Sequence, residues 1–343
     1  MTTTMNFAIV GYGMISAIHA RSIQELPGAN LIAVYGHNRE RAQAFAANYG
    51  AAAYDDYERM LENADIDIVC ILTPSGSHAE LGIAAAKAGK HVIVEKPIAI
   101  TLESADRLIE SCKVNNVKLC CISQHRYDHA IIALKNAVDS GQLGQLNFGA
   151  SHTKWYRTQA YYDNNEWRGT WALDGGGALM NQSVHYIDLL QYIMGPVDEV
   201  FAYCATRAHA GIEVEDVGAA TVKFKSGAIG LIEGNTSAYP GFSTRLDIYG
   251  SDGGVIIEND EVKEWKLRNE GLYEPPKTKV ESIVGASRAD ISHHSHKLQI
   301  ADFMKAIRTR QEPLVNGLEG RKTLQIVLSL YESARTGKPI QIK

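Results

Sequence analysis

The stretch NFAIVGYGMIS, residues 6–16, decides the fold. Its apolar first half is typical of a buried strand, and its second half favours the start of a helix. Between the two, Gly11 permits a tight turn and Gly13 lets the backbone approach a pyrophosphate, which the amides at the helix N-terminus then face. Met14 and Ile15 open that helix. These four residues are therefore predicted to contact a dinucleotide cofactor.

The third small residue of the turn is Ser16 rather than glycine, so the match to the dinucleotide pattern is imperfect. Taken alone, the turn also fits another α/β protein. Four more strand patterns follow, however, and helical patterns separate them. The strand patterns cover residues 31–35, 66–72, 91–94 and 118–122. This alternation predicts a doubly wound parallel sheet, the Rossmann arrangement.

The pattern changes after residue 123. One helix over residues 130–140 is followed by longer strand-like segments, with a long helix predicted over residues 177–194. Two helices close the chain. The fold is thus predicted to be α/β, with a Rossmann domain over residues 1–123 and an α/β domain with an open, mostly antiparallel sheet over residues 124–343. The C-terminal helices are free to pack back on the first domain.

Composition excludes several classes of function. The chain has 343 residues, enough for two domains, and a net charge of −5 with no basic run, which disfavours a nucleic-acid partner. No apolar window reaches the roughly 18 residues of a membrane span, and the N-terminus lacks a signal-peptide pattern. The five cysteines are an odd number without metal-like spacing, which favours reduced thiols in the cytoplasm.

The end of the second predicted strand is expected to select the cofactor. A carboxylate there binds the ribose hydroxyl of NAD, whereas donors accept the additional phosphate of NADP. Gly36 occupies that position, and His37, Asn38 and Arg41 follow it. These residues are predicted to contact the cofactor, and NADP is favoured over NAD.

Several motifs coincide downstream. They are TPSGSH (residues 73–78), EKP (95–97), WRGTW (167–171) and GGGALMNQSVHYIDLL (175–190). With the glycine turn, they resemble the Gfo/Idh/MocA family of oxidoreductases over essentially the whole chain. The resemblance implies NAD(P)-dependent oxidation or reduction of a sugar, sugar derivative or inositol-like cyclitol. It also implies a homodimer or homotetramer, which the open sheet often mediates.

Lys96 directly follows a parallel strand, at the sheet edge where ligands bind in open α/β folds. Its ammonium can stabilise negative charge on a substrate oxygen. The resemblance gives Lys96 a catalytic role and places Glu95 beside the cofactor. Pro97 is expected to fix the turn, for which a cis bond is one possibility.

His185 is the predicted proton acceptor, since alcohol oxidation requires a base and histidine titrates in the useful range. On a regular helix, Asn181 and Asp188 share its face, and both are predicted to bind substrate. The family often has Asp where this chain has Asn181, and an amide cannot take a proton. The alternative for His185 is a buried side chain hydrogen-bonded to Asp188.

The resemblance implies further site residues. Thr73, Pro74, His78, Gln124, Trp167 and Arg168 are predicted at the cofactor. Arg126 and Tyr156 are predicted at the substrate, although the aromatic stretch from residue 155 to 167 equally suits strand-edge or oligomer contacts. The sequence HHSH (293–296) has no accompanying carboxylate or cysteine pattern, so no metal is predicted.

Two other functions remain open. Some proteins of this kind cleave glycosides by transient oxidation with tightly held NAD, and the fold also serves as a nucleotide-sensing regulator. The presence of both Lys96 and His185 argues against a non-catalytic sensor.

Overall fold

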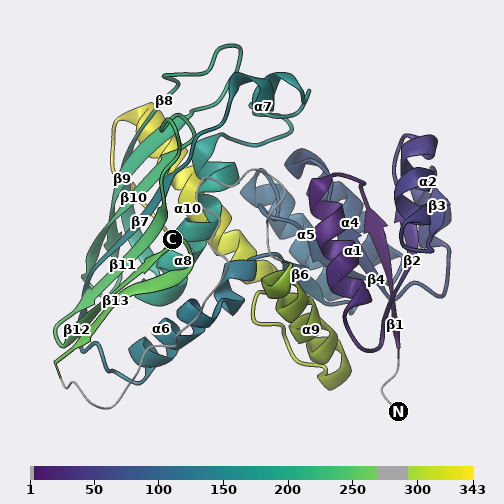
Figure 1. Cartoon of the computed structure of the whole chain (residues 1–343), viewed down its shortest axis with the longest axis horizontal. Coiled ribbons are helices and arrows are strands. Elements are labelled where there is room, and N and C mark those ends of the chain that lie inside the picture. Colours follow the sequence, from purple (N-terminus) through teal and green to yellow (C-terminus); the bar gives the residue numbers. More distant parts are fainter. Residues whose placement is uncertain (1–3, 269–292) are drawn as a thin grey trace. The chain divides into compact units, whose positions relative to one another are not determined.

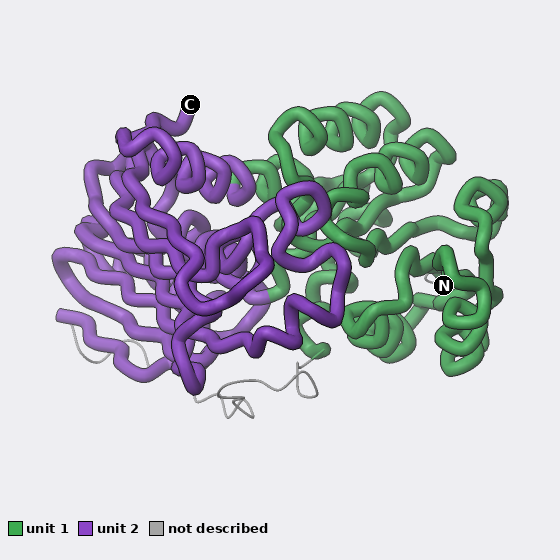
Figure 2. Tube along the Cα trace, turned by 90° about the horizontal axis from the view of Figure 1, so that it is seen from above, with its two compact units in different colours: residues 1–124, 291–322 green, residues 125–290, 323–343 purple. Residues whose placement is uncertain are grey.

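The computed structural model describes residues 4–268 and 293–343. The chain forms two compact units (Figure 2). Unit 1 comprises Met1–Gln124 and Ile291–Lys322, and unit 2 comprises His125–Asp290 and Thr323–Lys343. The first crossing lies next to the expected boundary at residue 123, but the chain also returns to unit 1 near its C-terminus.

Unit 1 is built on a six-stranded, entirely parallel sheet with the strand order β3-β2-β1-β4-β5-β6 (Figure 1). This is the order of a dinucleotide-binding Rossmann fold, as predicted. The strands are β1 (Met5–Val10), β2 (Ala29–Tyr35), β3 (Ala52–Tyr54), β4 (Ile68–Ile71), β5 (His91–Val94) and β6 (Leu119–Cys121). Strands β1 and β4 are almost fully buried, which explains their continuous apolar sequences.

Helices connect these strands and cover the sheet. They are α1 (Met14–Gln24), α2 (Arg39–Ala47), α3 (Tyr57–Leu61), α4 (His78–Lys87) and α5 (Leu102–Val114), with short turns η1 (Ser75–Ser77) and η2 (Gln124–Tyr127). The later helix α9 (His294–Thr309) packs beside α1 and adds Ile300, Phe303 and Met304 to the core. The sequence pattern predicted α9 as a helix; its place in the core of unit 1 follows from the tertiary structure.

Unit 2 contains an open eight-stranded sheet with the order β13-β12-β11-β7-β10-β9-β8-β14. Only the β7–β10 pair is parallel. The strands are β7 (Leu146–Lys154), β8 (Val197–Ala205), β9 (Val217–Phe224), β10 (Ile229–Asn235), β11 (Thr244–Gly250), β12 (Gly253–Glu258), β13 (Glu261–Leu267) and β14 (Ile340–Gln341). The sequence analysis did not anticipate β12, β13 or β14.

Helices of unit 2 cover one face of this sheet (Figure 1). They are α6 (His129–Asp139), α8 (Val184–Met194) and α10 (Gly317–Thr336), of which the first turns of α10 belong to unit 1. The short helix α7 (Gln159–Asp163) also belongs to unit 2. Along β9, alternate residues are buried and exposed, as expected for a sheet with one covered face.

The long helix predicted over residues 177–194 is interrupted. Its first part, η3 (Ala178–Gln182), is a π-helical turn in which the Ser183 amide donates to the Ala178 carbonyl, and only α8 is a regular α-helix. Such turns rotate the residues before them relative to those after, and they occur frequently at functional sites. Among the described residues, no helix has both the length and the apolar character of a membrane span.

Candidate active site

The glycine turn after β1 has the tight geometry predicted for a phosphate site. Gly11 has a φ of +111°, and a Cβ atom there would lie 2.8 Å from the carbonyl oxygen of Leu72. Any side chain would therefore be strained and would also clash with the end of β4. The backbone conformation at position 11 therefore requires glycine.

The N-terminus of α1 is suited to bind an anion. Its cap, Gly13, offers no side-chain hydrogen bond, and the first turn carries no acidic residue, so the first amides of the helix are not capped by a side chain. Ser16 is fully buried, which agrees with its expected close packing, and its Oγ has no hydrogen-bond partner among the described residues. Gln124 also has a buried Oε1 without a described partner. These features fit a bound dinucleotide.

The loop after β2 does not have the geometry expected for NADP. A Cβ atom on Gly36 would lie 2.1 Å from Cε1 of Tyr12, so the Tyr12 ring fills the space beside this glycine. The Arg41 guanidinium lies over the same ring, 4.8 Å from its centroid. The side chain of Asn38 accepts from the Arg41 amide and caps α2, while Nδ1 of His37 pairs with the Tyr35 hydroxyl. The expected phosphate donors therefore already have internal roles.

Two carboxylates lie near this loop that the sequence reasoning did not use. The Gly36 amide donates to the Tyr54 carbonyl at the end of β3, and Asp55 and Asp56 follow directly. Burial and then the charges of Asp56 and Asp55 raise the pKa of Tyr35, so their field reaches the end of β2. This negative charge opposes a second phosphate on the ribose.

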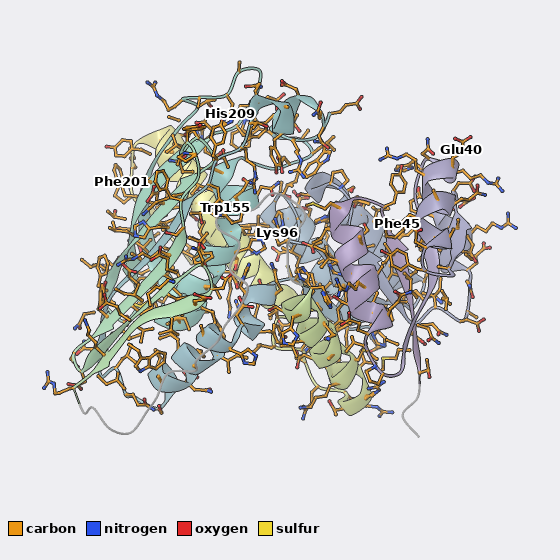
Figure 3. The ribbon with its side chains drawn as sticks, viewed as in Figure 1. Glu40, Phe45, Lys96, Trp155, Phe201 and His209 are labelled. Atoms are coloured by element: carbon orange, nitrogen blue, oxygen red, sulfur yellow. The ribbon has the colours of Figure 1, made fainter. Side chains whose placement is uncertain are left out.

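Lys96 lies two residues after Val94, the end of β5, at the carboxyl edge of the parallel sheet (Figure 3). The Lys96–Pro97 peptide is cis, in agreement with the sequence expectation. The backbone amide of Lys96 donates to Oε2 of Glu95 at 3.1 Å, and Oε1 of Glu95 pairs with Nε2 of His19 at 2.9 Å. Nε2 of His296 lies 3.8 Å from the same oxygen.

Glu95 has a structural role in unit 1, and its predicted contact with the cofactor remains a prediction. Its side chain is buried, and both oxygens hold internal partners. Burial raises the pKa of Glu95, but the hydrogen bond from His19 and the attraction of His19, His296 and Lys96 outweigh burial and lower it to about 2. Glu95 is a buried anion that fixes the backbone of Lys96.

His78 joins two loops at the carboxyl edge of the sheet. Its imidazole is 1% exposed, with Nδ1 2.8 Å from the Pro97 carbonyl and Nε2 2.9 Å from the Thr73 carbonyl. Both ring nitrogens thus contact backbone carbonyls, and burial lowers the pKa of His78. The side chain connects the loop that carries Thr73 and Pro74 to the turn after Lys96, and its predicted cofactor contact remains a prediction. Thr73 itself pairs with Ser77 through their hydroxyl groups.

In unit 2, the π-helical turn carries Asn181. Its Nδ2 donates to Oδ1 of Asp174 at 2.6 Å. Asp174 is buried, and its other oxygen accepts from the Gly169 amide. Asn181 therefore lies beside a carboxylate that the sequence reasoning missed, although Asp174 immediately precedes the glycine run of the motif. An amide at position 181 is complementary to that carboxylate, whereas a second carboxylate would repel it.

His185 is half-buried on the first turn of α8. Its ring contacts the ring of His125 edge-on, with centroids 5.2 Å apart. Nδ1 of His125 pairs with Asp128 at 2.7 Å and with Asp260 at 3.3 Å. Burial lowers the pKa of His125, but Asp260 and Asp128 outweigh burial and raise it well above the usual value. Sequence reasoning missed His125 as a neighbour of His185. It also missed Asp260, which pairs with His125 but is distant from it in the chain.

Asp188 and Arg126 form an internal ion pair. Both side chains are almost fully buried, with two hydrogen bonds of 2.7 and 2.8 Å between them. The hydroxyl of Thr323 donates to the same carboxylate, and the Arg126 guanidinium lies over the Tyr192 ring. Loss of either partner would leave an uncompensated buried charge. The substrate contacts of Asp188 and Arg126 remain predictions.

The glycine run before the π-helical turn serves as a helix entry. The buried carboxylate of Glu215 accepts from the amides of Gly177 and Leu179 and from the Tyr331 hydroxyl. Burial raises the pKa of Glu215 to about 7. The Glu215 side chain therefore caps the helical segment that begins after the glycine run.

The aromatic segment, residues 155–167, lies in unit 2 with Arg168 beside it. The ring of Tyr156 contacts Tyr239 edge-on at 5.2 Å. The Arg168 guanidinium lies over the rings of Tyr161 and Trp167, at 4.2 and 4.4 Å from their centroids. Trp167, Arg168 and Tyr156 are all half-buried in unit 2, and their ligand contacts remain predictions.

This geometry agrees with the similarity of the chain to known proteins. Residues 5–124 match the model of an oxidoreductase family with an NAD-binding Rossmann fold, and residues 131–256 match the GFO/IDH/MocA C-terminal domain. The WlbA dehydrogenase from Bordetella pertussis, solved in complex with NADH and UDP-GlcNAcA, is 33% identical, with 99% of each chain covered and a TM-score of 0.87.

Two inositol dehydrogenases are similar over their length. Myo-inositol 2-dehydrogenase of Thermotoga maritima is 27% identical, with 99% of each chain covered. The NAD(+)-dependent scyllo-inositol 2-dehydrogenase of Bacillus subtilis is 26% identical, covering 98% of this chain and 95% of that protein.

The Rossmann unit, the uncapped glycine turn and the second α/β unit define a nicotinamide-dependent oxidoreductase that acts on CH–OH groups. Within that class, the chain belongs to the Gfo/Idh/MocA family. The predicted preference for NADP over NAD is not supported, because the matching structure holds NADH and the loop after β2 lacks the expected phosphate contacts.

The pairing of Asn181 with Asp174 yields a prediction. Asn181→Asp places two carboxylates within hydrogen-bonding distance, so one of them retains a proton and its pKa rises in the folded state. A raised carboxyl pKa favours folding at low pH and costs stability as the pH rises through it. We expect a loss of about 2 to 4 kcal/mol in the free energy of unfolding at pH 8 and a smaller loss at pH 5, measured by urea denaturation.

The control is the exchanged double variant, Asp174→Asn with Asn181→Asp, which restores a single carboxylate and should recover most of the stability. An equal loss at both pH values in the single variant would show that charge repulsion is not the cause.

Proposed function

We propose that this protein is an NAD-dependent dehydrogenase that oxidises a secondary alcohol of a sugar, sugar derivative or cyclitol, or reduces the corresponding ketone. The observation that carries the proposal is Lys96, which follows β5 at the carboxyl edge of the parallel sheet with its backbone held by the buried Glu95 carboxylate. A cation at this edge is suited to stabilise charge on a substrate oxygen. The named relatives, two inositol dehydrogenases and a dehydrogenase with bound UDP-GlcNAcA, support the substrate class.

Most of the cofactor contacts that we propose lie in unit 1. Gly11, Gly13, Met14 and Ile15 bind the diphosphate at the uncapped N-terminus of α1. The other proposed contacts are Thr73, Pro74, Lys96 and Gln124 in unit 1, and Trp167 and Arg168 in unit 2. The bound nicotinamide supplies the hydride acceptor or donor of the reaction.

In the proposed reaction, His185 accepts the hydroxyl proton of the substrate and Lys96 stabilises the negative charge on its oxygen. We assign to an imidazole nitrogen of His185 the acceptance of the hydroxyl proton, since a neutral histidine is a base in the useful pH range. The Lys96 ammonium donates a hydrogen bond to the same substrate oxygen and stabilises its negative charge as the proton leaves. Asn181 and Tyr156 hold the substrate through hydrogen bonds. In the reverse direction, His185 returns the proton.

We further propose a homodimer or homotetramer formed through the uncovered face of the unit 2 sheet. Phe201 on β8 lies on this face, away from the helices (Figure 3). Tyr203, two residues further along β8, contacts the Phe201 ring, and cross-strand pairing places Leu231 of β10 in the same row as Phe201. Tyr203, Ile229 and Leu231 are 71%, 58% and 40% exposed. Large apolar side chains gathered on one face are typical of a protein interface.

The role of Lys96 is tested by Lys96→Ala. We expect kcat to fall by at least about 10²-fold, the range observed when a charge-stabilising donor is lost, while the affinity for NADH stays within a few-fold. Initial rates with myo-inositol and with sugar substrates, together with NADH fluorescence titration, measure both quantities. Lys87→Ala, an exposed lysine of the same unit, is the control. Full activity of Lys96→Ala would refute the proposed mechanism.

The cofactor preference is tested with the unmodified protein. We expect kcat/KM for NAD to exceed that for NADP by at least about tenfold, which corresponds to roughly 1.4 kcal/mol, because Asp55 and Asp56 oppose a second phosphate. Reduced nicotinamide formation at 340 nm measures both constants. Equal constants or a preference for NADP would contradict this assignment.

The proposed interface is tested by Leu231→Lys, which introduces a charge into the apolar row. Because a buried unpaired charge is costly, we expect a smaller assembly than that of the unmodified protein in sedimentation velocity. Leu318→Lys on α10, which is also exposed, is the control. If the unmodified protein is a monomer, or if the variant assembles to the same size, another surface or none forms the oligomer.

A further inference from the structure

Arg157 in unit 2 has an unusual environment for a half-buried cation. Its guanidinium carbon lies 4.9 Å from the ring centroid of Trp155 and 5.3 Å from that of Tyr161. Within unit 2, no described acidic side chain forms an ion pair with Arg157, and its Nε is buried without a hydrogen-bond partner in the described part of the chain. By contrast, the buried Arg126 has a bidentate carboxylate partner in Asp188.

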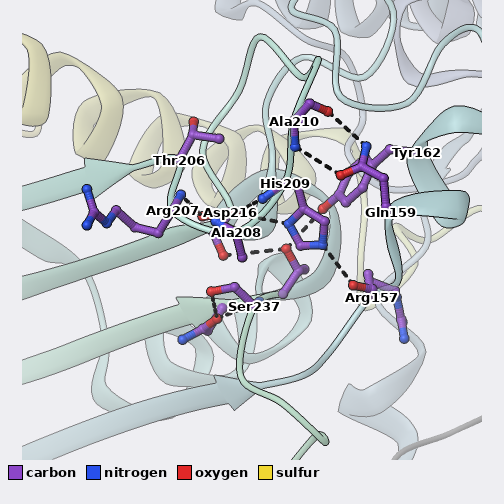
Figure 4. Close-up of polar contacts among 12 residues, drawn as sticks. Arg157, Gln159, Tyr162, Thr206, Arg207, Ala208, His209, Ala210, Asp216 and Ser237 are labelled. Carbon is purple, nitrogen blue, oxygen red and sulfur yellow. Dashed lines mark hydrogen bonds and ion pairs between the residues drawn. The ribbon is translucent and has the colours of Figure 1, made fainter.

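The backbone of Arg157 is held on both sides. Its amide donates to the Thr236 carbonyl at 2.8 Å, and its carbonyl lies 2.7 Å from Nε2 of His209. Nδ1 of His209 pairs at 2.9 Å with the fully buried carboxylate of Asp216, and this carboxylate also accepts from three backbone amides of the same loop. Figure 4 shows this network, with the Arg157 side chain directed away from His209. The Arg157 side chain therefore extends from a backbone position that hydrogen bonds hold in place.

A second guanidinium lies close to the first. Tyr161 contacts both Arg157 and Arg168, whose guanidinium carbon is 4.2 Å from the Tyr161 ring centroid. The Tyr161 hydroxyl also accepts from Nε2 of Gln182 at 3.0 Å. Gln182 belongs to the same π-helical turn as Asn181. The two arginines are thus connected through Tyr161 to the segment that carries the proposed substrate-binding residue.

A guanidinium presents a planar array of N–H donors that matches a carboxylate or a phosphate with two parallel hydrogen bonds. The rings of Trp155 and Tyr161 lie beside the Arg157 guanidinium, and within the described residues this guanidinium donates no hydrogen bond. An arginine that is fixed in position, half-buried and without a described anionic partner is suited to receive an anion from a ligand.

We propose that Arg157 is a specificity-determining residue that binds the carboxylate or phosphate of an anionic sugar substrate, with Arg168 adding positive charge beside it. The proposal rests on the sugar dehydrogenase function above and narrows its substrate class. An uncharged cyclitol such as myo-inositol lacks the group that Arg157 binds, so it gains nothing from this arginine.

The test compares Arg157→Gln with Arg207→Gln, which removes the charge of an exposed arginine in the neighbouring loop. Three probes differ in charge: UDP-GlcNAcA has a diphosphate and a carboxylate, UDP-GlcNAc has only the diphosphate, and myo-inositol has neither. Initial rates with NAD give kcat and KM for each, and calorimetric titration in the presence of NADH gives the affinities without turnover. Thermal unfolding of each variant verifies that it is folded.

We expect Arg157→Gln to weaken binding of an anionic probe by about 10- to 100-fold, the size of a lost charge-assisted hydrogen bond. The constants for myo-inositol should change by less than about twofold, and Arg207→Gln should resemble the unmodified protein. Arg157→Lys should recover part of the loss. If only UDP-GlcNAcA is affected, the carboxylate is the bound group; if both nucleotide sugars are affected equally, it is the diphosphate.

Equal losses for charged and uncharged probes in Arg157→Gln, or no loss for either, would overturn the inference. So would an unmodified protein that binds neither nucleotide sugar. The dehydrogenase function fails separately: anionic sugars would then bind in an Arg157-dependent manner, but no probe would yield reduced nicotinamide.

Discussion

The buried carboxylate of Glu95 is the constraint around which unit 1 is organised. An anion in an apolar interior is very unfavourable unless hydrogen bonds and opposite charge surround it. Here two partners come from distant parts of the chain, His19 on α1 and His296 on α9, and the third is the backbone amide of the adjacent Lys96. The contacts of Glu95 therefore join α1, α9 and the turn that carries the proposed catalytic lysine.

Buried carboxylates in unit 2 also have hydrogen-bond donors around them. Asp174, Asp188, Glu215 and Asp216 accept from backbone amides or from donor side chains, and Asp247 pairs with Arg245. His185 and Arg157 are the half-buried groups to which we assign the proton transfer and the recognition of an anion.

Asn181 departs from the Asp that is frequent in the family, and Gly36 departs from the carboxylate expected of an NAD site; both have local physical explanations. Asn181 stands beside the buried Asp174, so an amide satisfies that carboxylate where an acid would repel it. Gly36 accommodates the Tyr12 ring, which Arg41 covers. Neither departure can be interpreted from the position alone, because the partner that explains it lies elsewhere in the chain.

The sequence by itself determined the Rossmann order, the glycine turn, the family motifs and the places of Lys96 and His185. These features depend on local patterns: apolar periodicity, the steric needs of Gly11, and residues adjacent in the chain. Only the tertiary structure decided what Glu95, His78, Arg126 and Asp188 do, since each has buried partners from other segments. It likewise added α9 to the core of unit 1 and brought Asp55 and Asp56 to the end of β2. The physical reason is that a polar side chain acquires its role from the charges and hydrogen-bond partners around it after folding, and a linear pattern does not contain them.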